Sequence, residues 1–111
     1  MRMHLWLILA ALVGAAGCSH APAAPQRVEI KVTDNGFEPK IVNVQAGRPV
    51  TLVVERLTDQ TCATELVMKD RNINLPLPLH QAVEVTFAPG ARGDRTYACG
   101  MDMYHGTVHV E

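Results

Sequence analysis

Residues 27–32 read Arg-Val-Glu-Ile-Lys-Val, a strict alternation of charged and β-branched apolar side chains. Because successive side chains of an extended chain point to opposite faces, this stretch predicts a strand with one buried face. Residues 34–36 follow as Asp-Asn-Gly, a combination that is typical of turns. The stretch therefore predicts the first strand of a sheet, ended by a tight turn.

Short apolar runs separated by turn residues recur along the rest of the chain. Further strands are predicted at residues 41–45, 50–55, 63–68, 82–87, 95–99 and 106–110. Residues 69–79 are interrupted by prolines and predict an excursion that contains a short helical turn. Seven short strands at such spacing favour an all-β Greek-key sandwich, built as a single domain over residues 27–111.

The chain begins with a segment of a different character. Arg2 is followed by an apolar run at residues 5–16, which is too short to span a bilayer comfortably and predicts an export signal. The run ends in Ala-Ala-Gly-Cys at residues 15–18, which resembles a bacterial lipoprotein cleavage box with Ala15 in place of the usual Leu. We expect a lipoprotein signal peptide at residues 1–17, a lipid on Cys18 and a flexible tether at residues 18–26.

The alternative for this leader is ordinary secretory cleavage after residues 21–23, which would leave a soluble periplasmic protein. Both readings place the domain in the periplasm or at a membrane surface of the cell envelope. Arg2 is one of ten basic residues in the chain, so nine remain after the leader against eleven acidic residues. With no basic run, the sequence gives no footprint for nucleic acid, and we expect no such partner.

The residues that carry chemistry gather at residues 97–106, which read Tyr-Ala-Cys-Gly-Met-Asp-Met-Tyr-His-Gly. Cys99, Met101 and Met103 stand at alternate positions, so an extended chain points them to one face. Same-face positions lie roughly 6.5 to 7 Å apart, too far for three sulfurs to share one ion, so the segment must curl, for which Gly100 is suited. Alternatively, Cys99 bridges two ions and each Met serves a different one.

Thiolate and thioether sulfur select Cu(I) over hard cations, because a soft ion gains most from polarisable ligands. Cys62 offers a second thiol in the loop that enters the strand predicted at residues 63–68, and a sandwich can bring that loop to the same end as Cys99. His105 is a candidate extra ligand. Neither an orienting carboxylate nor an oxyanion hole can be assigned to Cys99 and His105 as a nucleophile and base, so we expect no catalysed reaction.

Three separated motifs resemble one family. They are Thr61-Cys62 with Glu65, Leu77-Pro78-Leu79, and Cys-Gly-Met-Asp-Met at residues 99–103 followed by Gly106. Together they resemble cupredoxin-like domains, and in particular membrane-anchored copper chaperones associated with copper-exporting P-type ATPases. The resemblance implies that Cys62, Cys99, Met101 and Met103 bind Cu(I), with more than one ion held. It also implies copper delivery, sequestration or resistance, with a P-type ATPase or another periplasmic copper protein as partner.

Other readings stay open at this point. An electron-transfer cupredoxin or an oxidase-associated copper protein is the main alternative, although such sites need two His and a Cys with a weak axial Met. The third is a metal-free interaction domain stapled by a disulfide between Cys62 and Cys99. We expect the remaining candidates to have ordinary structural roles: a core position for Met68, solvent-facing positions for His20, His80, His109, Glu65 and Asp102, and core cover by Leu77-Pro78-Leu79.

Overall fold

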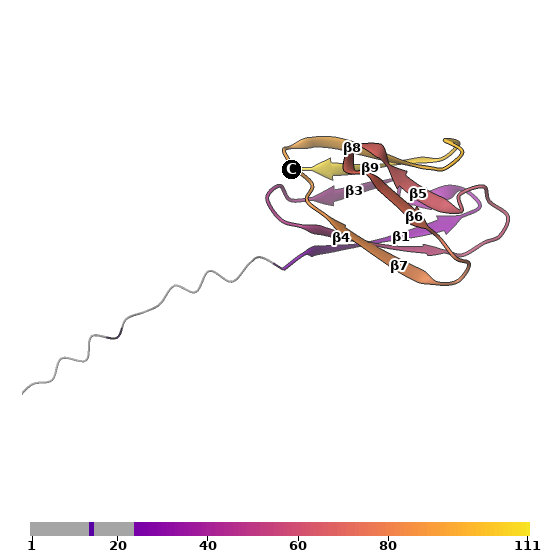
Figure 1. The fold of residues 1–111 in the computed structure, drawn as a ribbon, viewed down its shortest axis with the longest axis horizontal. Coiled ribbons are helices and arrows are strands. Elements are labelled where there is room, and N and C mark those ends of the chain that lie inside the picture. Colours follow the sequence, from indigo (N-terminus) through magenta and orange to yellow (C-terminus); the bar gives the residue numbers. More distant parts are fainter. Residues whose placement is uncertain (1–13, 15–23) are drawn as a thin grey trace, which may run out of the picture.

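Two β-sheets pack face to face in the computed structural model, which describes residue 14 and residues 24–111 (Figure 1). The expectations for the signal peptide, Cys18 and His20 lie outside the described residues. The first sheet has the strand order β2-β1-β4-β7 and the second the order β3-β9-β8-β5-β6. Among the described residues, no helix is long and apolar enough to cross a membrane.

The strands of the four-stranded sheet are β1 (Gln26–Thr33), β2 (Gly36–Glu38), β4 (Val50–Arg56) and β7 (Ala82–Phe87). Those of the five-stranded sheet are β3 (Ile41–Val44), β5 (Glu65–Met68), β6 (Ile73–Pro76), β8 (Gly93–Cys99) and β9 (His105–Val110), and a 3-10 turn, η1 (Lys69–Arg71), follows β5. Two pairs, β1 with β4 and β3 with β9, are parallel, and the other pairs are antiparallel.

The alternation in residues 27–32 fixes the buried face of β1. Ile30 and Val32 are fully buried, whereas Glu29 is exposed and Lys31 is only half-buried. The inward faces of the other strands complete one core between the sheets, and Tyr97 of β8 is its largest fully buried side chain. The all-β sandwich predicted from the sequence is confirmed.

The described residues form nine strands, whereas the sequence predicted seven. The two additional strands are β2, which has three residues and starts at a glycine, and β6, which lies in the proline-interrupted excursion. Pro76 ends β6 at the edge of the sheet, where a residue without an N–H is tolerated. The predicted helical turn in this excursion is present as η1, and the strand predicted at residues 63–68 begins only at Glu65.

One end of the sandwich contains both cysteines of the domain, and we call it the thiol end. It is formed by the loops at residues 34–35, 57–64, 77–81 and 100–104, on the right in Figure 1. The far end is formed by the loops at residues 45–49 and 88–92. The turn η1 and Asn72 lie beside the second of these loops, because Arg71 of η1 donates to the carbonyl oxygens of Ala88 and Pro89. The strand directions therefore decide which loops can meet.

Candidate metal centre

Cys99 is the last residue of β8, and its side chain points inward between the sheets. Tyr97, two positions earlier on the same face, is fully buried, and Cys99 itself is 2% exposed. Its backbone pairs with Leu66 of β5 on one side. On the other side, β8 continues into the loop at residues 100–104 that leads to β9. Cys99 thus lies at the inner edge of the thiol end.

The loop after Cys99 curls back on this residue, which is one of the two arrangements that the sequence left open. The N–H of Asp102 donates to the carbonyl oxygen of Cys99 at 2.9 Å. The N–H of Cys99 donates to the carbonyl oxygen of Tyr104 at 3.0 Å. Asp102 has a φ of 59°, in the left-handed region that Asp tolerates better than most residues. A tight turn therefore replaces the straight alternation of side chains, and the loop folds around the sulfur of Cys99.

Backbone N–H groups of this loop surround the Cys99 sulfur. Met103 N and Tyr104 N lie 3.3 Å and 3.4 Å from Sγ. Burial by itself raises the pKa of Cys99, but the N–H groups of Tyr104, Met103 and Met101, together with the Cys62 thiol, outweigh it and hold the pKa below its ordinary value. Cys99 is therefore predisposed to be a thiolate, which is the form that binds metal.

Cys62 lies in the loop that crosses from β4 of the first sheet to β5 of the second, and β5 pairs with β8 beside Cys99. The loop is held by short turns: Ala63 N donates to Thr61 Oγ1 at 3.0 Å, and Thr64 N donates to the carbonyl oxygen of Cys62 at 2.9 Å. Cys62 is half-buried, and its thiol is within hydrogen-bonding reach of Cys99. Burial, the Cys99 charge and that hydrogen bond raise the pKa of Cys62. Both residues are free thiols in this structure.

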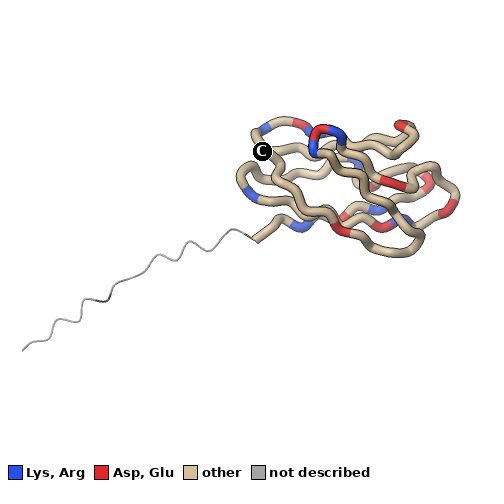
Figure 2. Tube along the Cα trace, viewed as in Figure 1, with Lys and Arg blue, Asp and Glu red and all other residues tan. Residues whose placement is uncertain are grey.

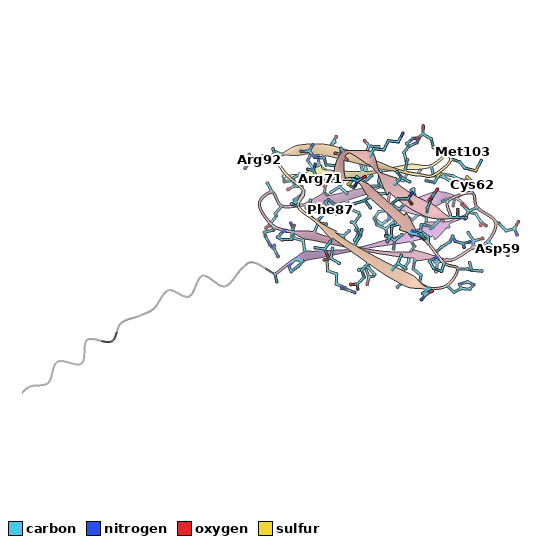
Figure 3. The ribbon with its side chains drawn as sticks, in the orientation of Figure 1. Asp59, Cys62, Arg71, Phe87, Arg92 and Met103 are labelled. Carbon is cyan, nitrogen blue, oxygen red and sulfur yellow. The ribbon has the colours of Figure 1, made fainter. Side chains whose placement is uncertain are left out.

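The two loop methionines lie on the outside of the thiol pair. Met101 and Met103 are 68% and 66% exposed, so neither fills the core. Met68, by contrast, is fully buried, as predicted. Figure 3 labels Met103 and Cys62 at the same end of the molecule. The thiol end therefore presents buried and half-buried thiols beneath two accessible thioethers.

The histidines are not grouped with the thiols. His105 is exposed, and its Nε2 lies 2.8 Å from Asp102 Oδ1, within the same loop. His80 is also exposed, as expected, and His109 Nδ1 is 2.6 Å from Asp94 Oδ1 on β8. In the described part of the chain, no three His, Cys, Asp or Glu side chains converge as a metal site.

Two glycines near the centre are there because other side chains occupy their space. A Cβ on Gly100 would overlap with the carboxylate of Glu65, and a Cβ on Gly106 would overlap with the ring of Tyr97. The Tyr97 ring stands edge-on to Phe37 at 5.0 Å between centroids. Glu65 is half-buried, and its carboxylate lies against Gly100 in the loop that follows Cys99. Glycines flanking a ligand loop indicate such close approaches, but sequence alone does not name the approaching residue.

Arg56 is a further residue that sequence reasoning missed. Its Nε donates to the carbonyl oxygen of Leu77 at 2.7 Å and its Nη1 to that of Thr58 at 3.2 Å. Leu77 N also donates to the carbonyl oxygen of Thr64 at 2.9 Å. These bonds connect the loop at residues 57–64, which carries Cys62, to the Leu77-Pro78-Leu79 segment. Leu77 is buried and covers the core as expected, whereas Leu79 is 38% exposed.

Comparison with known proteins agrees with this architecture. A family model for the cupredoxin-like domain matches residues 5–110. The metal-binding domain of the Cu(I)-exporting P-type ATPase CopA from Streptococcus pneumoniae D39, solved with Cu(I), is similar, with 25% identity and a TM-score of 0.71, covering 77% of this chain and 84% of that one.

A second similar structure is a copper binding protein solved by NMR in the apo form, with 27% identity and a TM-score of 0.70, covering 77% and 86% of the two chains. Auracyanin A, a blue copper protein from Chloroflexus aurantiacus, shares the fold at 19% identity, with a TM-score of 0.58 and coverage of 79% and 100%. A search of curated proteins gave no match.

Proposed function

The chain belongs to the cupredoxin-like domain family, and from this premise we propose that it holds Cu(I) through Cys62, Cys99, Met101 and Met103. The carrying observation is that a Cys99 thiolate, favoured by backbone N–H groups, lies within hydrogen-bonding reach of Cys62. Two thiolates and two thioethers form a soft ligand set, which selects Cu(I) over hard cations. Similarity to a metal-binding domain solved with Cu(I) supports the same metal.

The geometry supports tight holding of Cu(I) rather than electron transfer. An electron-transfer copper site uses two His and one Cys with a weak axial Met. Here the second thiol comes from Cys62, and His105 is paired with Asp102 outside the thiols. Because Met101 and Met103 are exposed while Cys99 is buried, the methionines can also serve a second Cu(I) that Cys99 bridges. Anaerobic titration counts the Cu(I) ions held by each chain.

The proposed role is copper delivery, sequestration or resistance, without a catalysed reaction. We infer that the chain is exported, carries a lipid on Cys18 and faces the periplasm. Its proposed partner is a copper-exporting P-type ATPase or another periplasmic copper protein, a choice supported by the similarity to a metal-binding domain of such an ATPase. Mass spectrometry of the protein extracted from membranes tests the lipid, which would add a mass to the peptide that begins at Cys18.

Anaerobic Cu(I) titration against a competing chelator tests the binding site. We expect the double variant Cys62→Ser, Cys99→Ser to lose tight binding, and Met101→Leu and Met103→Leu each to weaken it by about tenfold or more, which is ~1.4 kcal/mol. Met68→Leu is the matched control, because this Met is buried in the core. Unchanged affinity in the double Cys variant would rule out the proposed site. An intense blue absorption after oxidation would favour electron transfer instead.

A further inference from the structure

The loops of the thiol end carry acidic residues and no Lys or Arg. Asp34, Asp59 and Asp102 lie one each in the loops at residues 34–35, 57–64 and 100–104. Glu65 begins β5 at the same end, against Gly100. In Figure 2 the loop tips at this end, on the right, are red or tan. The surface that surrounds the thiols is therefore negative.

Three cationic residues lie near this end of the sandwich, but outside its loops. Arg56 donates to two backbone carbonyls, and Lys31 Nζ lies 3.1 Å from Glu55 Oε2. Lys40 precedes β3 at the side of the sandwich and follows Glu38 by two residues. Arg56 keeps its charge and places it against the loops at residues 57–64 and 77–81. Asp34, Asp59, Asp102 and Glu65 nevertheless outnumber Arg56 and Lys40 at this end, so acidic charge predominates there.

The far end has the opposite balance. Its loops and η1 carry Arg48, Arg92, Lys69 and Arg71 against Asp70, and the acidic Glu111 lies beside them, since Ala46 N donates to its carbonyl oxygen. The whole chain is close to neutral, with a formal charge of −1. The molecule is therefore electrically polar along its long axis, with the negative pole around the thiols. An oriented field of this kind aligns an approaching charged molecule more than it attracts it from afar.

Apolar side chains are exposed among these acidic residues. Met101 and Met103 are joined by Leu57 and Leu79, which are 41% and 38% exposed. All four lie in loops of the thiol end, and they are four of the five large hydrophobic side chains that are exposed in the described residues. Exposed apolar side chains that share one end of a molecule with polar neighbours are typical of an interaction surface.

We propose that the thiol end docks onto a Cu(I)-accepting protein whose metal-binding face carries Lys or Arg around an apolar centre. This inference rests on the proposed function, because it assigns a partner to the same copper site. Opposite charges at the rims orient the two metal sites toward each other, and the exposed Leu and Met side chains supply the contact that closes over the ion. A negatively charged acceptor face would be repelled.

Transfer of Cu(I) to two synthetic peptides tests the proposal. Both peptides contain a Cys-x-x-Cys pair and have the same length and matched Cu(I) affinity, but one carries four Lys and the other four Glu around the pair. At 10 mM salt we expect the Lys peptide to remove Cu(I) from the loaded protein on the order of tenfold faster. At 500 mM salt the two rates should converge, because the screening length has become short. Equal rates at 10 mM salt would overturn the proposal.

Two variants of equal net charge show where the effect originates. The variant Asp34→Asn, Asp59→Asn, Asp102→Asn should lose the preference for the Lys peptide, and Asn keeps the left-handed backbone of residue 102. The control variant, in which the three acidic residues changed lie away from the thiol end, should keep it; it consists of Asp70→Asn, Glu84→Gln and Glu111→Gln. Equal loss of the preference in both variants would also overturn the proposal, because net charge alone would then explain the rates.

A second readout separates this proposal from that of the copper site. The Cu(I) stoichiometry of the loaded protein is measured first and reports on the ligands alone. Metal-free NMR titrations with the two peptides, their Cys replaced by Ser, then report on docking alone. The Lys peptide should shift the amide signals of residues 57–64 and 100–104, and the Glu peptide should not. Absent or scattered shifts would contradict docking even if Cu(I) binds as proposed.

Discussion

The pH dependence of Cu(I) affinity should distinguish the two thiols, because the fold shifts their pKa values in opposite directions. Burial and the neighbouring Cys99 raise the pKa of Cys62 above the ordinary 9.0. Burial also raises the pKa of Cys99, but backbone N–H groups and Cys62 outweigh it and leave that pKa below 9.0. At a pH between the two pKa values, Cys99 is already a thiolate and Cys62 is still a thiol. Binding of Cu(I) then releases one proton, which comes from Cys62.

Each released proton changes the affinity about tenfold per pH unit. Between the Cys99 pKa and pH 9 we therefore expect the Cu(I) affinity to rise about tenfold for each pH unit. Below the Cys99 pKa both thiols are protonated, and the affinity should rise about a hundredfold for each pH unit. Two ordinary thiols would give the hundredfold dependence up to pH 9. The assay is competition with a Cu(I) chelator of known protonation behaviour, carried out anaerobically at intervals from pH 6 to pH 9.

Variants assign the proton to its residue. Cys62→Ser should make the affinity nearly independent of pH between the Cys99 pKa and pH 9, whereas Cys99→Ser should keep a one-proton dependence, because Cys62 still has to lose its proton. Met101→Leu is the matched control, which should lower the affinity without changing the slope, since a thioether carries no proton. A tenfold slope that persists near pH 9 in Cys62→Ser would refute this reasoning.

Three further predictions concern stability. Gly106→Ala should lower the free energy of unfolding by ~1–3 kcal/mol in denaturant titrations, because the new methyl group would overlap with the buried Tyr97 ring; a loss below about 0.5 kcal/mol would contradict that contact. Tyr97→Phe should raise stability by about 1 kcal/mol, because the Tyr97 hydroxyl is buried without a hydrogen-bond partner among the described residues; destabilisation would instead reveal a partner. The hydrogen bond to Asp94, with its charge and that of Glu111, raises the pKa of His109 against the opposing effect of burial. The stabilisation of the folded state by protonated His109 should be full below pH 6.5 and should disappear as pH rises through the pKa that His109 has in the folded state. Unfolding of His109→Gln and the parent chain at pH 5.5, 7 and 8.5 checks this, and a pH-independent difference would exclude the linkage.

Local sequence pattern was sufficient for most of the fold. Strands with one buried face alternate with period two, and all seven predicted strands lie within about two residues of observed ones. The two additional strands, β2 and β6, gave no such signal. β2 has three residues, and β6 lies in a proline-rich stretch where only pairing with β5 stabilises an extended chain. Pairing is a property of the sheet, so it leaves little trace in a short segment.

The sequence by itself determined one part of the candidate site, which is the spacing of the soft ligands Cys99, Met101 and Met103 in one short segment. Only the tertiary structure decided how Cys62 meets Cys99, because the loop that carries Cys62 crosses from β4 in one sheet to β5 in the other, and β5 there pairs with β8. It alone also set the opposite pKa shifts of the two thiols, since these depend on N–H groups and burial that exist only once the loop has folded. The order of residues decides which ligand types are present in the loop. The distance between the two thiols and their state of charge depend on segments far apart in sequence that pack together only in the folded protein.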